Sequence, residues 1–149
     1  MHHTELFCDG RPCNLLIIDD ERPILDLLGE TIADEGFRVT LVPDLTSALA
    51  ALGRECFDLV LADALAAFTT GFTIDQWSAL EAIRDRAGAR RVIIFSAHPE
   101  SQFAGYRERG FLDYIGKPFD LDDLIATLRH HLADASRDRE TSPAQLTTA

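Results

Sequence analysis

Short apolar runs alternate with amphipathic stretches along most of this chain of 149 residues. The runs contain few polar residues, which is typical of strands buried on both faces of a parallel sheet. The stretches between them repeat apolar residues at helical spacing. Strands that alternate with helices predict an open parallel sheet with helices on both faces. The expected strands are Leu15–Ile18, Arg38–Val42, Phe57–Ala62, Val92–Phe95 and Tyr114–Ile115.

The expected helices follow these strands in turn, which gives five strand–helix units. Asp44 and Asp120 are candidate N-caps, and Gly36 is a natural stop for the first helix. The fourth helix is short, about residues 100–108. The other four helices carry their apolar residues within 24–32, 45–52, 77–87 and 121–132.

Polar residues follow the expected strands at the points where the strands end. They are the acidic pair Asp19 and Asp20, then Asp63, Ser96 and Lys117, the only lysine of the chain. Ligands of open parallel sheets bind outside the carboxyl ends of the strands, where these side chains would meet. The pattern therefore predicts one polar site at that edge of the sheet.

Clustered carboxylates repel one another unless a cation neutralises them, and Mg²⁺ is suited to such a cluster and to phosphate. We expect Asp20 and Asp63 to contact Mg²⁺, with Asp19 acting directly or through water. Asp63 would attack a phosphoryl group to form an aspartyl phosphate. Lys117 would neutralise the phosphoryl charge, and the Ser96 hydroxyl would donate a hydrogen bond to a phosphoryl oxygen.

Each of these residues also has an ordinary structural interpretation. Asp19 and Asp20 could simply cap the first helix, and Lys117 could form an ion pair with Asp120. Ser96 alone is uninformative. The order and spacing of the whole set favour a phosphoacceptor site.

The segments Asp19-Asp20, Asp63, Ser96 and Lys117-Pro118-Phe119 resemble the receiver domain of bacterial two-component response regulators. The resemblance covers about residues 14–132. It implies a flavodoxin-like, doubly wound (βα)5 fold with the strand order 2-1-3-4-5. It also implies that a sensor histidine kinase or a phosphotransfer protein donates the phosphoryl group to Asp63. Such a domain is not an enzyme, although it assists its own phosphorylation and dephosphorylation.

Two further roles follow from this resemblance. The backbone carbonyl of Leu65, two residues past the acceptor, would be a metal ligand. Tyr114 would be the aromatic switch residue, whose ring moves inward when Ser96 moves to the phosphate. An ordinary half-buried strand aromatic is an equal alternative for Tyr114.

The loop after the acceptor departs from the family's pattern. The family usually has proline four residues after the acceptor and Asp-Gly seven and eight residues after it, whereas here Ala67, Thr70 and Gly71 occupy these positions. The loop Ala64–Asp75 is also longer and more apolar. It could fold onto its own helix, or it could be a surface for partner docking or self-association.

Three functions are compatible with these features. The first is a stand-alone receiver that switches an unknown downstream protein, and a homodimer is possible. The second is a degenerate receiver that acts as an interaction module without phosphate, as the altered loop would allow. The third is a phosphatase similar to the haloacid dehalogenase hydrolases, whose nucleophile lies in an Asp-x-Asp pattern on the first strand. The adjacent pair Asp19-Asp20 does not match that pattern.

Composition limits the partners and the location. The net charge of −11 argues against nucleic acids and anionic membranes. Residues 1–5 lack the layout of a signal peptide, so we expect a cytoplasmic protein. We expect residues 1–13 to be a flexible lead-in, 14–133 the receiver domain and 134–149 a disordered polar tail.

The three cysteines, Cys8, Cys13 and Cys56, cannot all pair with one another. A zinc site of Cys8 and Cys13 with His2 and His3 could be drawn, but no second ligand pair follows at a matching spacing. We therefore expect reduced thiols without a metal.

Overall fold

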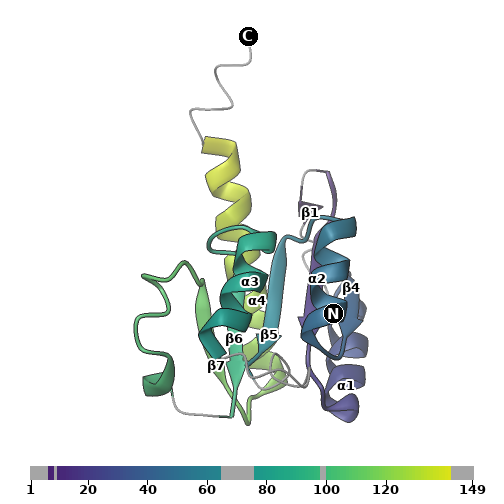
Figure 1. The fold of residues 1–149 in the computed structure, drawn as a ribbon. Coiled ribbons are helices and arrows are strands. Elements are labelled where there is room, and N and C mark those ends of the chain that lie inside the picture. Colours follow the sequence, from purple (N-terminus) through teal and green to yellow (C-terminus); the bar gives the residue numbers. More distant parts are fainter. Residues whose placement is uncertain (1–6, 9, 65–75, 98–99, 142–149) are drawn as a thin grey trace.

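The structure is a computed structural model that describes residues 7–8, 10–64, 76–97 and 100–141 (Figure 1). Its centre is a parallel sheet of five strands in the spatial order β4-β3-β5-β6-β7. Counted along the chain within this sheet, the order is 2-1-3-4-5, so the expected flavodoxin-like fold is confirmed. The strands are β3 (Asn14–Ile18), β4 (Arg38–Val42), β5 (Leu59–Asp63), β6 (Val92–Ser96) and β7 (Asp113–Gly116).

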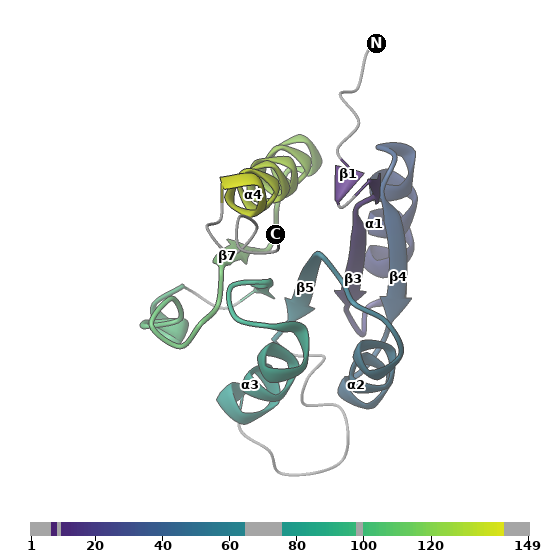
Figure 2. The same ribbon diagram turned by 90° about the horizontal axis from the view of Figure 1, so that it is seen from above.

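Helices cover both faces of this sheet. Helices α1 (Arg22–Asp34) and α4 (Leu121–Thr141) lie on one face, and α2 (Leu45–Arg54) and α3 (Gln76–Ala87) lie on the other (Figure 2). Asp44 is the N-cap of α2, and its carboxylate accepts a hydrogen bond from the Ser47 backbone N–H at 2.8 Å, as expected from the sequence.

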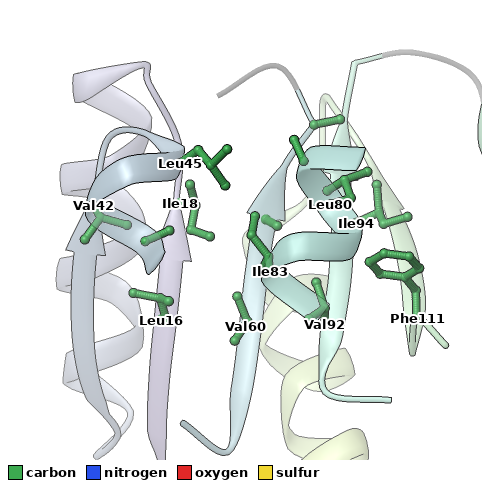
Figure 3. Close-up of a cluster of buried hydrophobic side chains, with 14 of the residues drawn as sticks. Leu16, Ile18, Val42, Leu45, Val60, Leu80, Ile83, Val92, Ile94 and Phe111 are labelled. Atoms are coloured by element: carbon green, nitrogen blue, oxygen red, sulfur yellow. The ribbon is translucent and has the colours of Figure 1, made fainter. Parts of the chain in front are cut away.

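The strands contribute alternate side chains to two separate cores, one on each face. On the α2 and α3 face, Leu16 and Ile18 of β3 lie in one cluster with Leu80 and Ile83 of α3 (Figure 3). Leu15 and Ile17 belong to the core beneath α1 and α4. The continuous apolar runs in the sequence are explained by this burial on both faces.

The expected fourth helix is not an α-helix. Glu100–Phe103 forms the 3₁₀ helix η2, and turns continue to Gly110. Gly105 and Gly110 adopt φ of +84° and +92°, values that L residues with side chains rarely take and that interrupt a helix. The described residues therefore contain four α-helices and η2, not five α-helices.

Aromatic side chains attach η2 and the segment that follows it to helix α3. The rings of Phe103 and Phe111 each lie 5.7 Å from the Trp77 ring, measured between centroids. The Arg109 guanidinium lies 4.0 Å from the centroid of the Trp77 ring, a cation–π contact. These contacts replace the helix packing that was expected here.

The N-terminal segment contains a short hairpin. Strands β1 (Phe7–Cys8) and β2 (Arg11–Pro12) pair antiparallel, and Gly10 has φ of +77° at the turn. Cys8 and Cys13 are joined by a disulfide, so the expectation that these cysteines are reduced thiols is wrong. Strands of two residues leave no periodicity in the sequence, which is why the pairing was missed. Cys56 is a free, exposed cysteine.

At the other end, helix α4 continues to Thr141, past the expected start of the tail at residue 134. Residues 134–141 lack an apolar stripe, but they include alanine, arginine and glutamate, which favour helix. Residues 142–149 lie outside the described residues. None of the described helices has the length and apolar content to cross a membrane. The cytoplasmic location stays a prediction.

Candidate functional site

The carboxyl ends of the central strands bring the predicted polar residues together. Asp63 is the last residue of β5, and Ser96 is the last residue of β6. Asp19 follows β3, and its backbone N–H donates to the Val42 carbonyl at 3.1 Å. The backbone N–H of Lys117, just after β7, donates to the Ser96 carbonyl at 2.8 Å. The sheet itself therefore positions these residues at one edge.

Lys117 links the two buried carboxylates. Its Nζ lies 2.9 Å from Oδ2 of Asp19 and 3.4 Å from Oδ2 of Asp63. The side chains of Asp19 and Asp63 are 0% and 1% exposed, and that of Lys117 is 10% exposed. The three groups together carry one more negative than positive charge, and all three are largely shielded from solvent.

The surroundings raise the pKa of Lys117 above its ordinary value of 10.5. Burial alone lowers this pKa, because it disfavours the charged ammonium. The hydrogen bond from Lys117 to Asp19 and the negative charge of Asp63 act in the opposite direction and outweigh burial. Lys117 is therefore fully charged at neutral pH.

Glu21 belongs to the same group, although it was not among the predicted site residues. Its Oε1 lies 3.5 Å from the Lys117 Nζ, and ligand oxygens of Asp19, Asp20 and Glu21 lie within 4.8 Å of one another. Asp20 and Glu21 are exposed, whereas Asp19 is buried. The position of Glu21 directly after the acidic pair was the available signal.

The structural alternatives for these residues receive little support. Oδ1 of Asp19 accepts the Glu21 N–H at 2.9 Å, but Glu21, the N-cap of α1, makes no capping bond with its own side chain. Asp120 accepts the Asp123 N–H at 3.1 Å and so caps α4. Lys117 points to Asp19, Asp63 and Glu21 instead.

The residues fit a hard divalent cation. Carboxylate oxygens of Asp19, Asp20, Glu21 and Asp63 gather at one edge of the sheet, and such oxygens are the ligands that Mg²⁺ prefers. The excess negative charge of the buried pair is a second argument for a cation. The predicted carbonyl ligand at Leu65 lies outside the described residues, as do Ala67, Thr70 and Gly71 of the unusual loop.

The two residues expected to act as a switch occupy neighbouring strands. Ser96 is buried at the end of β6, and Tyr114 is half-buried in β7. The Tyr114 ring lies 5.9 Å from the Phe103 ring and 6.4 Å from the Tyr106 ring, measured between centroids. Tyr114 thus contacts the segment that replaces the fourth helix.

Comparison with known proteins agrees with this geometry. The family model of the response regulator receiver domain matches residues 15–129. The chain belongs to this family. Receiver domains are signalling phosphoacceptor domains and not classical enzymes, and their usual partners are histidine kinases or phosphotransfer proteins.

Curated relatives of this receiver domain are response regulators. It is 29% identical to the probable transcriptional regulatory protein TcrX of Mycobacterium tuberculosis. The alignment of 140 residues covers 93% of this chain and 57% of TcrX. It is 34% identical to a putative NtrX-like response regulator of Rickettsia felis. That alignment of 117 residues covers 78% of this chain and 24% of the relative. The chain therefore spans less than two thirds of the length of these relatives.

Solved structures show the same fold. The receiver domain of NtrX from Brucella abortus superposes with a TM-score of 0.68 at 32% identity, covering 80% of this chain and 98% of that domain. A CheY-like receiver protein from Methanospirillum hungatei superposes with a TM-score of 0.73 at 22% identity, covering 85% of this chain and 98% of that chain. The recognition of a receiver domain from the sequence is confirmed.

Proposed function

We propose that this receiver domain is a Mg²⁺-dependent phosphoacceptor and that Asp63 is the acceptor. A carboxylate oxygen of Asp63 attacks phosphorus while the bond from phosphorus to the donor's histidine nitrogen breaks. The donor is a sensor histidine kinase or a phosphotransfer protein. The observation that supports this function best is the position of Asp63, buried at the end of β5 and within reach of the Lys117 ammonium.

Asp19, Asp20 and Asp63 would hold Mg²⁺, and Glu21 is close enough to assist. When bound, Mg²⁺ supplies positive charge to the phosphoryl oxygens and lowers the repulsion between them and the carboxylates. These carboxylates would hold the cation beside Asp63, where the phosphoryl group would be transferred.

Lys117 and Ser96 would act on the phosphoryl group itself. The Lys117 ammonium already lies between Asp19 and Asp63, so a small movement would bring it to a phosphoryl oxygen. The Ser96 hydroxyl would donate a hydrogen bond to another oxygen. Phosphoryl transfer depends mainly on positioning and charge neutralisation, so these two groups have a large share in it.

Phosphorylation would bias a two-state equilibrium at the surface around Tyr114. Movement of Ser96 toward the phosphate would free space for the Tyr114 ring, which now packs beside Phe103 and Tyr106. A downstream protein that binds one state better would read this change. The self-catalysed loss of the phosphoryl group belongs to the same proposal.

The test is phosphorylation by acetyl phosphate with and without Mg²⁺, followed by intact mass. Wild type should gain one phosphoryl group only with Mg²⁺, and Asp63→Asn should gain none. Asp44→Asn is a matched control, because asparagine is as good an N-cap as aspartate and the site is untouched. Failure of wild type with acetyl phosphate and with a phosphorylated phosphotransfer protein would contradict the proposal and favour the phosphate-independent interaction module.

A further inference from the structure

A second cluster of reactive side chains lies at the amino end of the sheet, opposite the phosphoacceptor site. Cys8 and Cys13 of the hairpin segment meet Asp58, which directly precedes β5. Their sulfur and carboxylate oxygen atoms all lie within 4.8 Å of one another, and all three residues are buried. Asp58 is 45 residues from Cys13 in the chain, so no sequence spacing could have indicated it.

We propose that Cys8, Cys13 and Asp58 form a Zn²⁺ site when the disulfide is reduced. Four residues separate the two cysteines, a spacing that occurs in zinc sites. Two ligands of one zinc ion, each about 2.3 Å from it, lie no more than about 4.6 Å apart. The two sulfurs are bonded to each other in the disulfide and would separate after reduction, and the Asp58 carboxylate already lies within 4.8 Å of both. With water in the fourth position, the set gives the usual tetrahedral coordination.

The charges around the cluster favour the metal in the reduced state. Two thiolates and one carboxylate carry three negative charges, which is costly in a buried position. Zn²⁺ and the Arg11 guanidinium, 3.1 Å from Oδ2 of Asp58, would neutralise all three. In the disulfide form the sulfurs are uncharged, and the ion pair of Arg11 with Asp58 is balanced without a metal. The charges of these groups therefore cancel both in the disulfide state and in the reduced state with Zn²⁺ bound.

The ligand carboxylate is already oriented. Oδ2 of Asp58 accepts the Asn14 backbone N–H at 2.7 Å as well as the bond from Arg11. Hydrogen bonds of this kind fix metal ligands in place, and their loss typically weakens metal binding by about 10- to 100-fold. Arg11 is thus a positioning residue for the proposed site.

The redox step is a two-electron reduction. A phosphine reductant takes up the oxygen of one water molecule and becomes a phosphine oxide, while the disulfide bond breaks and each sulfur receives one proton. Zn²⁺ then displaces these two protons as it binds the two thiolates. The disulfide excludes Zn²⁺ because its sulfurs carry no negative charge.

The test uses the full chain, reduced with a phosphine and freed of metal. Zn²⁺ affinity is measured by competition with a chromophoric chelator, and reactive thiols are counted with a disulfide reagent. Three thiols should react without metal and one, Cys56, with one equivalent of Zn²⁺. The oxidised chain should not bind Zn²⁺.

Variants identify the ligands. Cys8→Ser and Cys13→Ser should each weaken Zn²⁺ binding by more than about 100-fold, and Arg11→Gln by about 10-fold or more. Cys56→Ser, the matched control, should bind like wild type. Asp58→Asn removes the carboxylate ligand and should weaken Zn²⁺ binding. If this variant does not fold, Asp58→Cys replaces it, because a third thiolate should bind Zn²⁺ more tightly than the carboxylate. Three reactive thiols in the presence of Zn²⁺, or equal affinity in the cysteine variants, would overturn the proposal and leave the disulfide as a cross-link only.

Discussion

Strand β5 has a buried aspartate at each end, and the two are held in different ways. Asp58, just before the strand, accepts a backbone N–H and an arginine on the same oxygen, at 2.7 and 3.1 Å. Asp63, the last residue of the strand, shares the Lys117 ammonium with Asp19. Within the part of the chain that the structure describes, Asp58 contacts the Arg11 guanidinium, whereas Asp19 and Asp63 both contact the Lys117 ammonium.

Burial of the carboxylate is common to both ends of β5, so burial alone does not distinguish the proposed phosphoacceptor from Asp58. Asp58 and Asp63 are both buried, at 8% and 1% exposure. The difference lies in the described ion pairs: one carboxylate with one guanidinium at Asp58, and two buried carboxylates with one ammonium at Asp63. The excess negative charge of Asp19, Asp63 and Lys117 at the carboxyl end favours a cation, as the proposed function requires. The balanced pair at the amino end stabilises the hairpin.

The largest difference in stability should come from removing the cationic side chain at each end, Lys117 or Arg11. Lys117→Ala leaves Asp19 and Asp63 buried without their ammonium, so we expect a loss of about 3 kcal/mol in the free energy of unfolding in the absence of Mg²⁺. Arg11→Ala removes a side chain that is 39% exposed, and solvent screening limits its cost to about 1 kcal/mol or less. Urea unfolding of both variants measures this. Equal losses would contradict the charge comparison.

The two aspartates should respond in opposite directions to the same substitution. Asp58→Asn weakens two hydrogen bonds to a charged acceptor, so we expect a loss of about 2 kcal/mol. Asp63→Asn removes one of two neighbouring buried charges, so stability without Mg²⁺ should be unchanged or higher. Thermal unfolding of both variants, with and without Mg²⁺, gives the comparison. A larger loss for Asp63→Asn would mean that charge balance does not distinguish the two ends.

Reduction of the Cys8–Cys13 disulfide should lower the stability of the amino end of the sheet and leave the site at the carboxyl end unchanged. The cross-linked residues are five positions apart, and closing a loop of about this length restricts the unfolded chain by about 2 kcal/mol. Reduction with a phosphine in the presence of a chelator should lower stability by about this amount. Phosphorylation of Asp63 by acetyl phosphate should be unchanged below the unfolding temperature. A reduced rate would reveal coupling between the two ends through β3 or β5.

The smallest expected effect is a difference in pH dependence. The Lys117 pKa is raised above 10.5, so its stabilising contribution is complete below that pH and is lost as the pH rises through the folded value. A guanidinium group is not deprotonated in proteins, so an arginine variant serves as the control. The stability difference between wild type and Lys117→Met should therefore stay constant up to about pH 10 and shrink above it. The corresponding difference for Arg11→Gln should stay flat. Shrinkage between about pH 7 and 9 in the lysine series would contradict the raised pKa.

The sequence was most informative where residues sit at strand ends. Asp19, Asp63, Ser96 and Lys117 could be placed together because the carboxyl ends of parallel strands share one edge. The five-stranded parallel sheet followed from the repeat of strands and helices, and its strand order was implied by the resemblance to receiver domains; both are confirmed. The roles of these residues in phosphoryl transfer stay predictions.

The rest depended on contacts that leave no local pattern. The bond from Arg11 to Asp58 joins residues 47 positions apart, and it starts from a strand of only two residues. A short helix was expected at about residues 100–108, but Gly105 at φ +84° interrupts it. Glu21 was passed over because an acidic residue at the start of a helix has an ordinary explanation.

Trp77, whose ring contacts the Arg109 guanidinium, is an intrinsic fluorescence probe of this region. Trp77 is the only tryptophan in the chain, and its ring contacts Phe103, which in turn contacts Tyr114. Emission on excitation of tryptophan therefore comes from one place, between α3 and the segment that follows η2. Any rearrangement of Tyr114 that reaches Phe103 changes the surroundings of this single fluorophore. The progress of such a rearrangement can be timed in the unlabelled protein by stopped-flow fluorescence.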